Sequence, residues 1–163
     1  MEQDTKIKII ERFDCYYAGI NNKGTFILTF NTFLIGAFIA GYYSLIKSID
    51  CAYMPAAKIL IALALLMTVV SLILSVFSII PYMGSDKINK SNWFFNDIAT
   101  SKEEDFIQKI DSVSVDDQTK DINTQIYYLA KGLRKKHWLI KLSLISNLIG
   151  LACIIPVILF VLY

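Results

Sequence analysis

The chain has 163 residues, of which 55% are hydrophobic and 18% are charged, and its formal net charge at neutral pH is +2. Three long apolar runs, residues 24–46, 59–82 and 138–163, take nearly half of the chain and leave too little for a second globular domain of usual size. The small net charge indicates no class of partner until the charges are mapped along the chain.

The first apolar run is long enough to cross a membrane. Residues 24–46 contain no charged side chain, and a helix of about 23 residues spans roughly 34 Å, against about 30 Å for the core of a bilayer. Because backbone polar groups in lipid must be satisfied within the segment, we expect a helix here. The run is too long for the apolar region of a signal peptide, so we expect it to remain in the protein.

Basic residues outside the apolar runs predict the orientation. They are concentrated before residue 24 and between residues 83 and 137, and few lie between residues 47 and 58. The excess of basic residues in cytoplasmic loops therefore places the first two regions in the cytoplasm and the last one outside.

We therefore expect an all-α membrane protein with three transmembrane helices and cytoplasmic helical extensions. The N-terminus would lie in the cytoplasm and the C-terminus outside. The predicted segments are a cytoplasmic amphipathic helix at 1–23, a transmembrane helix at 24–46, a short outer loop at 47–58, a second transmembrane helix at 59–82, a cytoplasmic helical segment at 83–137 and a third transmembrane helix at 138–163.

Small residues recur at helical spacing in the first apolar run. Thr32, Gly36 and Ala40 lie four residues apart, and Ala37 and Gly41 form a second pair. Such stripes allow the backbones of two helices to approach closely. Because three spans alone cannot enclose a sizeable pore, we expect a homo-oligomer.

Each apolar run holds a polar side chain at a similar depth. Counting along the helices places Asn31 and Ser75 about 10 Å, and Asn147 about 13 Å, from the cytoplasmic ends of their runs. These three residues form a predicted polar layer in the inner leaflet. They either hydrogen-bond between helices, at about 0.5–2 kcal/mol per contact, or line a pore. The two interpretations are compatible.

The segment after the second run combines aromatic and helical patterns. An aromatic cluster at residues 92–95 suits the bilayer interface or, alternatively, stacking on a nucleobase. Ser101 and Glu104 match a capping box, which would start a short helix. From about Asp116, apolar residues at helical spacing continue into the third run, which predicts one helix of about 45 residues.

Charge is polarised along this segment. Residues 83–129 contain nine acidic and five basic residues, whereas residues 131–141 contain five basic residues and no acidic one. One interpretation of the basic residues is anchoring to the cytoplasmic leaflet, at about 1 kcal/mol per residue. The other is binding of an anionic ligand by Arg134 or Lys135.

The residue pattern does not indicate catalysis, a metal or a cofactor. Cys15, Cys51 and Cys153 have no metal-binding or redox spacing, and the single histidine, His137, lies at a predicted membrane boundary. The sequence contains no nucleophile elbow, phosphate-binding loop or pair of zinc ligands. We therefore expect a protein that is not an enzyme and that binds neither metal nor cofactor.

Three short motifs follow one another in the order found in a known family. Residues 21–31 (NNKGTFILTFN) open the first run with a lysine and small residues, and residues 93–99 (WFFNDIA) form an aromatic element. Residues 125–130 (QIYYLA) lead to Lys135, Lys136 and the last run. In this order of motifs the chain resembles the transmembrane effectors of bacterial Pycsar anti-phage defence over nearly its whole length.

The resemblance implies a function in the bacterial inner membrane. In such a system a linked nucleotide cyclase senses infection and makes cyclic UMP or cyclic CMP. The effector responds by damaging the inner membrane, and the infected cell dies or stops growing. This reading involves lipid and a cyclic pyrimidine mononucleotide as partners, and no nucleic acid. The alternatives are a ligand-independent membrane scaffold and a holin-like pore former.

A cyclic mononucleotide carries one phosphate charge and one base. Its site therefore needs a cation and a flat apolar or hydrogen-bonding wall. The cytosolic candidates for the phosphate are Lys23, Arg134 and Lys135, and the candidates for the base are Trp93 and Tyr127.

Overall fold

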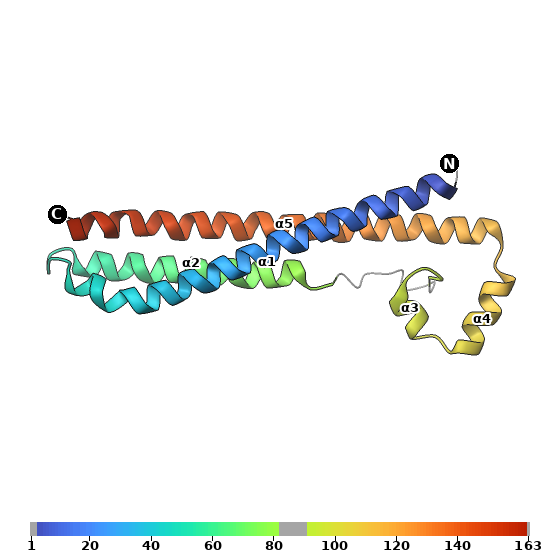
Figure 1. Cartoon of the computed structure of the whole chain (residues 1–163), viewed down its shortest axis with the longest axis horizontal. Helices are drawn as coiled ribbons and strands as arrows, with labels where there is room; N and C mark the ends of the chain where they lie inside the picture. Colours follow the sequence, from blue (N-terminus) through green and yellow to red (C-terminus); the bar gives the residue numbers. More distant parts are fainter. Residues whose placement is uncertain (1–2, 82–90, 163) are drawn as a thin grey trace. The chain divides into compact units, whose positions relative to one another are not determined.

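The computed structural model describes residues 3–81 and 91–162. All regular structure within these ranges is helical, and its elements are α1 (Gln3–Lys47), α2 (Met54–Ile79), α3 (Phe95–Ala99), α4 (Glu103–Ser112) and α5 (Val115–Leu162) (Figure 1). Three of them, α1, α2 and α5, are long and apolar enough to cross a membrane. The predicted all-α membrane fold is confirmed. The predicted segment limits at residues 1, 82, 83 and 163 lie outside the described residues.

The chain forms two compact units. The bundle unit comprises Ile20–Ile80 and Lys136–Tyr163, and the extension unit comprises Met1–Gly19 and Pro81–Lys135. The bundle unit contains nearly all of the three apolar runs, whereas the extension unit contains α3, α4 and the first part of α5. α1 and α5 each contribute residues to both units, because neither helix is interrupted at the division.

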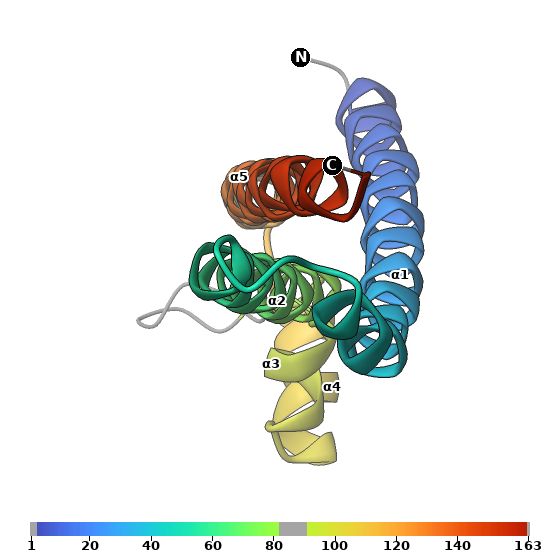
Figure 2. The same ribbon diagram turned by 90° about the vertical axis from the view of Figure 1, so that its left-hand side faces the viewer.

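Small and polar side chains make up much of the inside of the bundle unit. Figure 2 shows α2 and α5 of this unit nearly end-on. The buried residues of α2 alternate at spacings of four and three, which keeps them on one helix face. They are Ala57, Ile61, Ala64, Thr68, Ser71, Ser75 and Ser78. Larger apolar side chains, such as Ile59, Leu66 and Phe77, are exposed on the other faces. This inversion of the usual pattern is what a bundle surrounded by lipid requires, since lipid solvates apolar side chains.

Two glycines lie where an added side chain would meet a neighbouring helix. A Cβ atom at Gly24 of α1 would lie 2.8 Å from both Ile79 Cγ1 and Ser78 Oγ of α2. At Gly150 of α5 it would lie 3.1 Å from the carbonyl oxygen of Ala64. These positions therefore require glycine for packing, as small residues do at membrane helix crossings.

The predicted stripe of small residues has a different environment. A Cβ atom at Gly36 would meet nothing within 4 Å, and one at Gly41 would meet only Leu45 of the same helix, at 3.9 Å. Neither glycine contacts another helix of this chain. The spacing of small residues does not show which face of α1 packs against α2. In the structure that face carries Gly24.

The loop end of the bundle unit has an apolar core. Ile49, Ala57, Ile61 and Val157 are buried together there. The rings of Tyr53 and Phe160 stack with their centroids 5.0 Å apart. α2 begins at Met54, earlier than the predicted start at residue 59. Pro55 can occupy its first turn because a missing N–H costs no hydrogen bond there.

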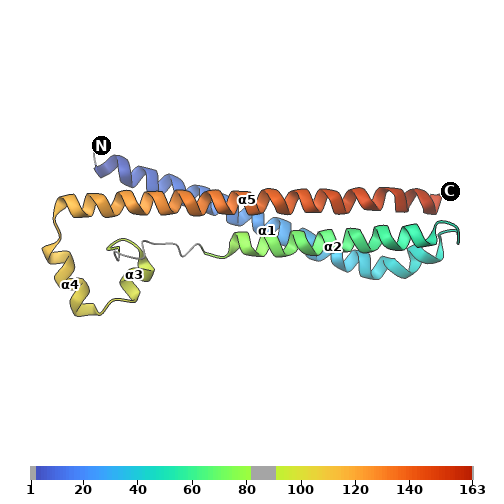
Figure 3. The same cartoon turned by 180° about the vertical axis from the view of Figure 1, so that it is seen from behind.

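In the extension unit, α3 and α4 precede the start of α5 (Figure 3). The Tyr17 hydroxyl of α1 donates a hydrogen bond of 2.8 Å to the carbonyl oxygen of Leu129 of α5. The predicted capping box is wrong, since the residue that caps α4 is Lys102 and no side chain caps this end. The Ser101 hydroxyl instead donates to the carbonyl oxygen of Asp97, at 2.8 Å.

Candidate functional site

Two carboxylates fix the loop that precedes α3. The Asp97 carboxylate accepts a hydrogen bond of 3.0 Å from the backbone N–H of Ser91, and the Asp121 carboxylate accepts one of 2.7 Å from the N–H of Asn92. The Ser91 hydroxyl oxygen accepts from the N–H groups of Trp93 and Phe94, at 3.0 and 3.2 Å. Four backbone N–H groups are thereby satisfied, and the loop is held against α3 and α5.

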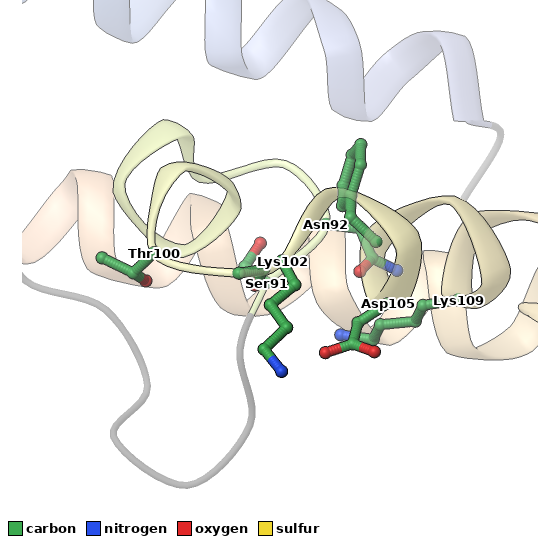
Figure 4. Close-up of a pocket in the computed structure, with 8 residues that line it drawn as sticks. Ser91, Asn92, Thr100, Lys102, Asp105 and Lys109 are labelled. Atoms are coloured by element: carbon green, nitrogen blue, oxygen red, sulfur yellow. The ribbon is translucent and has the colours of Figure 1, made fainter.

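A cavity of about 420 Å³ lies beside this loop (Figure 4). Its lining residues come from the loop, from the turn after α3 and from α4. They are Ser91, Asn92, Thr100, Ser101, Lys102, Asp105, Phe106 and Lys109. The side chains of Lys102, Asp105 and Lys109 gather on one side of it. The cavity thus combines cations with hydroxyl and amide groups, which can all bind an anion.

The lining of this cavity is net positive. Its ionisable side chains are two lysines, Lys102 and Lys109, and one carboxylate, Asp105. α4 begins at Glu103, and no side chain of the described residues caps this end, so N–H groups of its first turn have no side-chain partner among residues 3–81 and 91–162. A helix start with free N–H groups attracts negative charge, whereas the first-turn acids Glu103 and Glu104 oppose it. The positive charge of this lining therefore comes from the two lysines.

A second cavity, of about 250 Å³, lies on the other part of the same loop. Asn92, Trp93, Ile110, Val113 and Gln118 line it, so Asn92 belongs to both cavities. Trp93 is 51% exposed and offers a flat aromatic surface. The side-chain oxygen of Asn92 is buried and has no hydrogen-bond partner within the described residues. A flat ring beside an unpaired acceptor can recognise a planar ligand that carries an N–H donor.

The predicted nucleotide-binding residues are not all brought together. Trp93 lines the second cavity of the extension unit, whereas Lys23 lines a groove of the bundle unit. Arg134 and Lys135 are exposed and line none of these three cavities. Tyr127 is 62% exposed, and its ring makes an edge contact with Tyr128.

Sequence reasoning did not single out Asn92, Lys102, Lys109 or Gln118 as site residues. Their proximity arises from the packing of α3, α4 and α5, which no local pattern specifies. One available signal was the carboxylate of Asp97 six residues after Ser91, because an acidic residue soon after a serine can accept hydrogen bonds from a turn backbone.

A second polar feature runs through the bundle unit. The Asn31 amide donates a hydrogen bond of 2.8 Å to the hydroxyl oxygen of Ser71. The Ser143 hydroxyl lies 2.9 Å from the Ser71 hydroxyl and donates to the Ser71 carbonyl oxygen at 2.8 Å. Because Ser143 has one hydroxyl proton, the Ser71 hydroxyl must donate to Ser143. One directed chain of hydrogen bonds thus joins α1, α2 and α5.

The other two members of the predicted polar layer are bonded differently. The Ser75 hydroxyl donates within α2, to the carbonyl oxygens of Ser71 and Leu72. The side-chain oxygens of Asn31 and Asn147 are buried and have no partner within ranges 3–81 and 91–162. An unpaired buried acceptor costs about 1–3 kcal/mol, so this layer is not fully satisfied.

A buried lysine joins the three helices at one end of the bundle unit. Lys136 of α5 is 4% exposed. Its ammonium group donates hydrogen bonds to the Asn21 side-chain oxygen at 3.0 Å and to the carbonyl oxygen of Ile79, the last residue of α2, at 3.1 Å. A cation at the C-terminal end of a helix is also favoured by the helix dipole.

We expect replacement of Lys136 by Met to lower the free energy of unfolding by about 1–3 kcal/mol, since the acceptors of Asn21 and Ile79 lose their charged donor. The measurement is denaturant unfolding in detergent, followed by circular dichroism. Lys135→Met is the matched control, because Lys135 is exposed and has the same side chain. Equal stability of the two variants would contradict a role of the Lys136 contacts.

The burial of Lys136 predicts a pH dependence of stability. Burial lowers the pKa of Lys136 below its ordinary value of 10.5. Between the lowered folded pKa and the ordinary one, the unfolded chain holds a proton that the folded chain has released, so stability rises with pH in that window. The rise in stability with pH that Lys136 causes should be present in the wild type and in Lys135→Met. It should be absent in Lys136→Met.

A comparison with protein families shows which family the chain belongs to. The model of the Pycsar effector protein domain, PycTM, matches residues 7–163. The chain belongs to the Pycsar effector family. Neither a curated protein nor a solved structure matched it in the same comparisons.

Membership confirms the resemblance read from the sequence motifs. A Pycsar effector acts in anti-phage defence and is linked to cyclic nucleotide signalling. Together with its three membrane-length apolar helices, this makes the chain a membrane protein of antiviral defence.

Proposed function

We propose that this Pycsar effector is an inner-membrane protein that responds to cyclic UMP or cyclic CMP from a linked cyclase. Its response would be a rearrangement of a homo-oligomer that disrupts the membrane and leads to abortive infection. It would do so without catalysis, metal or cofactor. The observation that carries the proposal is the pair of cavities that share Asn92 in the extension unit.

The two cavities match the two parts of a cyclic mononucleotide. Lys102 and Lys109 would bind the phosphate, since two ammonium groups exceed the single carboxylate of Asp105. The base would stack on Trp93, a contact worth about 1–3 kcal/mol. Once the Asn92 side chain turns toward the cavity, its oxygen, which is buried and unpaired within the described residues, would accept a hydrogen bond from the N–H of uracil or from the amino group of cytosine.

The continuity of α5 supports a route from such a site to the membrane. Asp121 of α5 holds the loop that contains Asn92, and Gln118 of α5 lines the second cavity. The same helix contributes Ser143 to the hydrogen-bond chain of the bundle. If α5 can adopt two placements, a ligand that binds one of them more tightly shifts the equilibrium toward it. The size of the shift is set by the difference in affinity.

The unpaired acceptors of the bundle favour such a change. In the arrangement described, the side-chain oxygens of Asn31 and Asn147 lack donors. Rearranged helices could supply donors from another copy or from water. The free-energy difference between the two arrangements would then be small, as a switch requires.

The proposed orientation predicts a difference between two cysteines. Cys15 and Cys51 are both exposed in the structure, so their labelling reports the side of the membrane and not burial. In intact cells a membrane-impermeant thiol reagent should modify Cys51 but not Cys15. Labelling of Cys15 alone would reverse the orientation.

The proposed homo-oligomer predicts an effect of substitutions on α1. Gly36 and Gly41 meet no other helix of their own chain, so Leu at both positions should leave the fold of one chain intact. It should, however, disrupt close packing between copies and reduce the assembled size in detergent, measured by light scattering. The same size before and after substitution would contradict packing of copies through this face.

The proposed function is tested in cells that express the effector with or without a cyclase. We expect loss of membrane potential only when cyclic UMP or cyclic CMP is made. Depolarisation without any nucleotide would indicate a holin-like pore former. Unchanged potential with both nucleotides would indicate a scaffold.

A further inference from the structure

A groove on the bundle unit has no role in the proposed nucleotide response. It has a volume of about 380 Å³ and is lined by Asn22, Lys23, Phe26 and Ile27 of α1 and by Ile140 and Leu144 of α5. Ile27 and Ile140 are buried, whereas Phe26 is 72% exposed. The groove thus has an apolar floor and an exposed aromatic edge.

The groove is polar at one end only. Asn22 and Lys23 are its polar residues, and they precede the uncharged run at 24–46. Phe26 lies about one helical turn further into the run. Lys23 is exposed and has no ion pair within the described residues. A cation at the start of an apolar span lies at the level of the lipid headgroups.

We propose that this groove binds an anionic phospholipid. The phosphate group would lie against Lys23 and Asn22, and an acyl chain would lie along Phe26, Ile140 and Leu144. The phosphate would then contact polar side chains and the acyl chain apolar ones. The exposed Phe26 ring would gain an apolar neighbour. The proposal is independent of the nucleotide site.

The distribution of charge favours a lipid over a second bundle in this groove. Within Ile20–Ile80 and Lys136–Tyr163 the sequence contains one acidic residue, Asp50. Asp50 lies in the loop between α1 and α2, at the end of α1 remote from Lys23. The bundle of a second copy therefore has no acid to place beside Lys23 at the same depth, whereas a lipid phosphate is at that depth.

The test measures lipid association with the full chain in bilayers. Spin-labelled phosphatidylglycerol and spin-labelled phosphatidylcholine report the fraction of each lipid immobilised by the protein. We expect the wild type to prefer phosphatidylglycerol, and Lys23→Gln to reduce that preference by about fivefold, the effect of one cation at the membrane surface. Lys47→Gln, at the other end of α1, is the matched control and should keep the preference.

Further variants decide between sources of the effect. Leu144→Trp should fill the groove and lower the immobilised fraction of phosphatidylglycerol while Lys23 is retained.

An unchanged preference in Lys23→Gln, or its loss only in Arg134→Gln with Lys135→Gln, would overturn the proposal in favour of general attraction by exposed basic residues. Displacement of the lipid by soluble glycerol phosphate would overturn it in favour of a free-phosphate site. Efficient disulfide formation between copies carrying Phe26→Cys, with the native cysteines changed to Ser, would overturn it in favour of a second copy.

Discussion

Replacement of both Lys102 and Lys109 by Gln should abolish the response to cyclic nucleotide. Each lysine would donate a charge-assisted hydrogen bond to the phosphate, worth about 1.5–3 kcal/mol, so loss of two raises the nucleotide concentration needed by at least about a hundredfold. Without the lysines, the cavity lining retains the carboxylate of Asp105, which repels an anion. Binding is measured by isothermal titration calorimetry with the purified protein.

The control for this prediction is Arg134→Glu. Arg134 belongs to the basic residues at 131–141, for which the sequence allows membrane anchoring or phosphate binding. It is exposed and lines neither cavity beside the Asn92 loop. Its reversal should leave nucleotide affinity within about twofold. If Arg134→Glu abolishes binding and the lysine variant does not, the phosphate site lies at the basic residues and not at the cavity.

Leu in place of Gly24 or Gly150 should strongly destabilise the bundle unit. Even a Cβ atom at Gly24 would lie 2.8 Å from Ser78 and Ile79, and at Gly150 it would lie 3.1 Å from a backbone oxygen that cannot rotate away. Overpacking of this kind typically costs about 1–3 kcal/mol, and a leucine adds three more carbons than a Cβ alone. Denaturant unfolding in detergent measures the loss.

Gly36→Leu is the matched control, since the same substitution on the same helix meets open space. We expect it to leave the free energy of unfolding of a single chain unchanged or slightly higher, because glycine is the weaker helix former. A loss of stability at Gly36 equal to that at Gly24 would show that the closest helix contact of α1 lies elsewhere.

The helices themselves could be predicted because length and polarity determine them. An uncharged run longer than a bilayer core must be helical in lipid, and the apolar spacing after Asp116 continues without a proline until Pro156, inside α5. The continuity of α5 over 48 residues follows from that pattern. The capping box of α4 was predicted wrongly, since the Ser101 hydroxyl bonds to Asp97 and not to the helix that follows.

Contacts between helices could be predicted only in part. Depth in the membrane identified Asn31 as a residue that either bonds to a neighbouring helix or lines a pore. In the structure it bonds to Ser71 of α2 and not to Ser75. Both serines lie on the buried face of α2, one turn apart, and counting residues cannot distinguish them. In the same way, spacing identified Gly36 and Gly41, whereas the packing of α1 on α2 uses Gly24. The cavities beside Asn92 depend on three elements at once and had no local signature.

The most direct test of a nucleotide-controlled membrane effector uses purified components. The protein is reconstituted into liposomes loaded with a self-quenched dye, and cyclic UMP, cyclic CMP or cyclic AMP is added. We expect dye release with a cyclic pyrimidine nucleotide, little release with cyclic AMP, and none for the Lys102→Gln, Lys109→Gln variant. Equal release with and without nucleotide, or intact liposomes with both cyclic pyrimidine nucleotides, would contradict it.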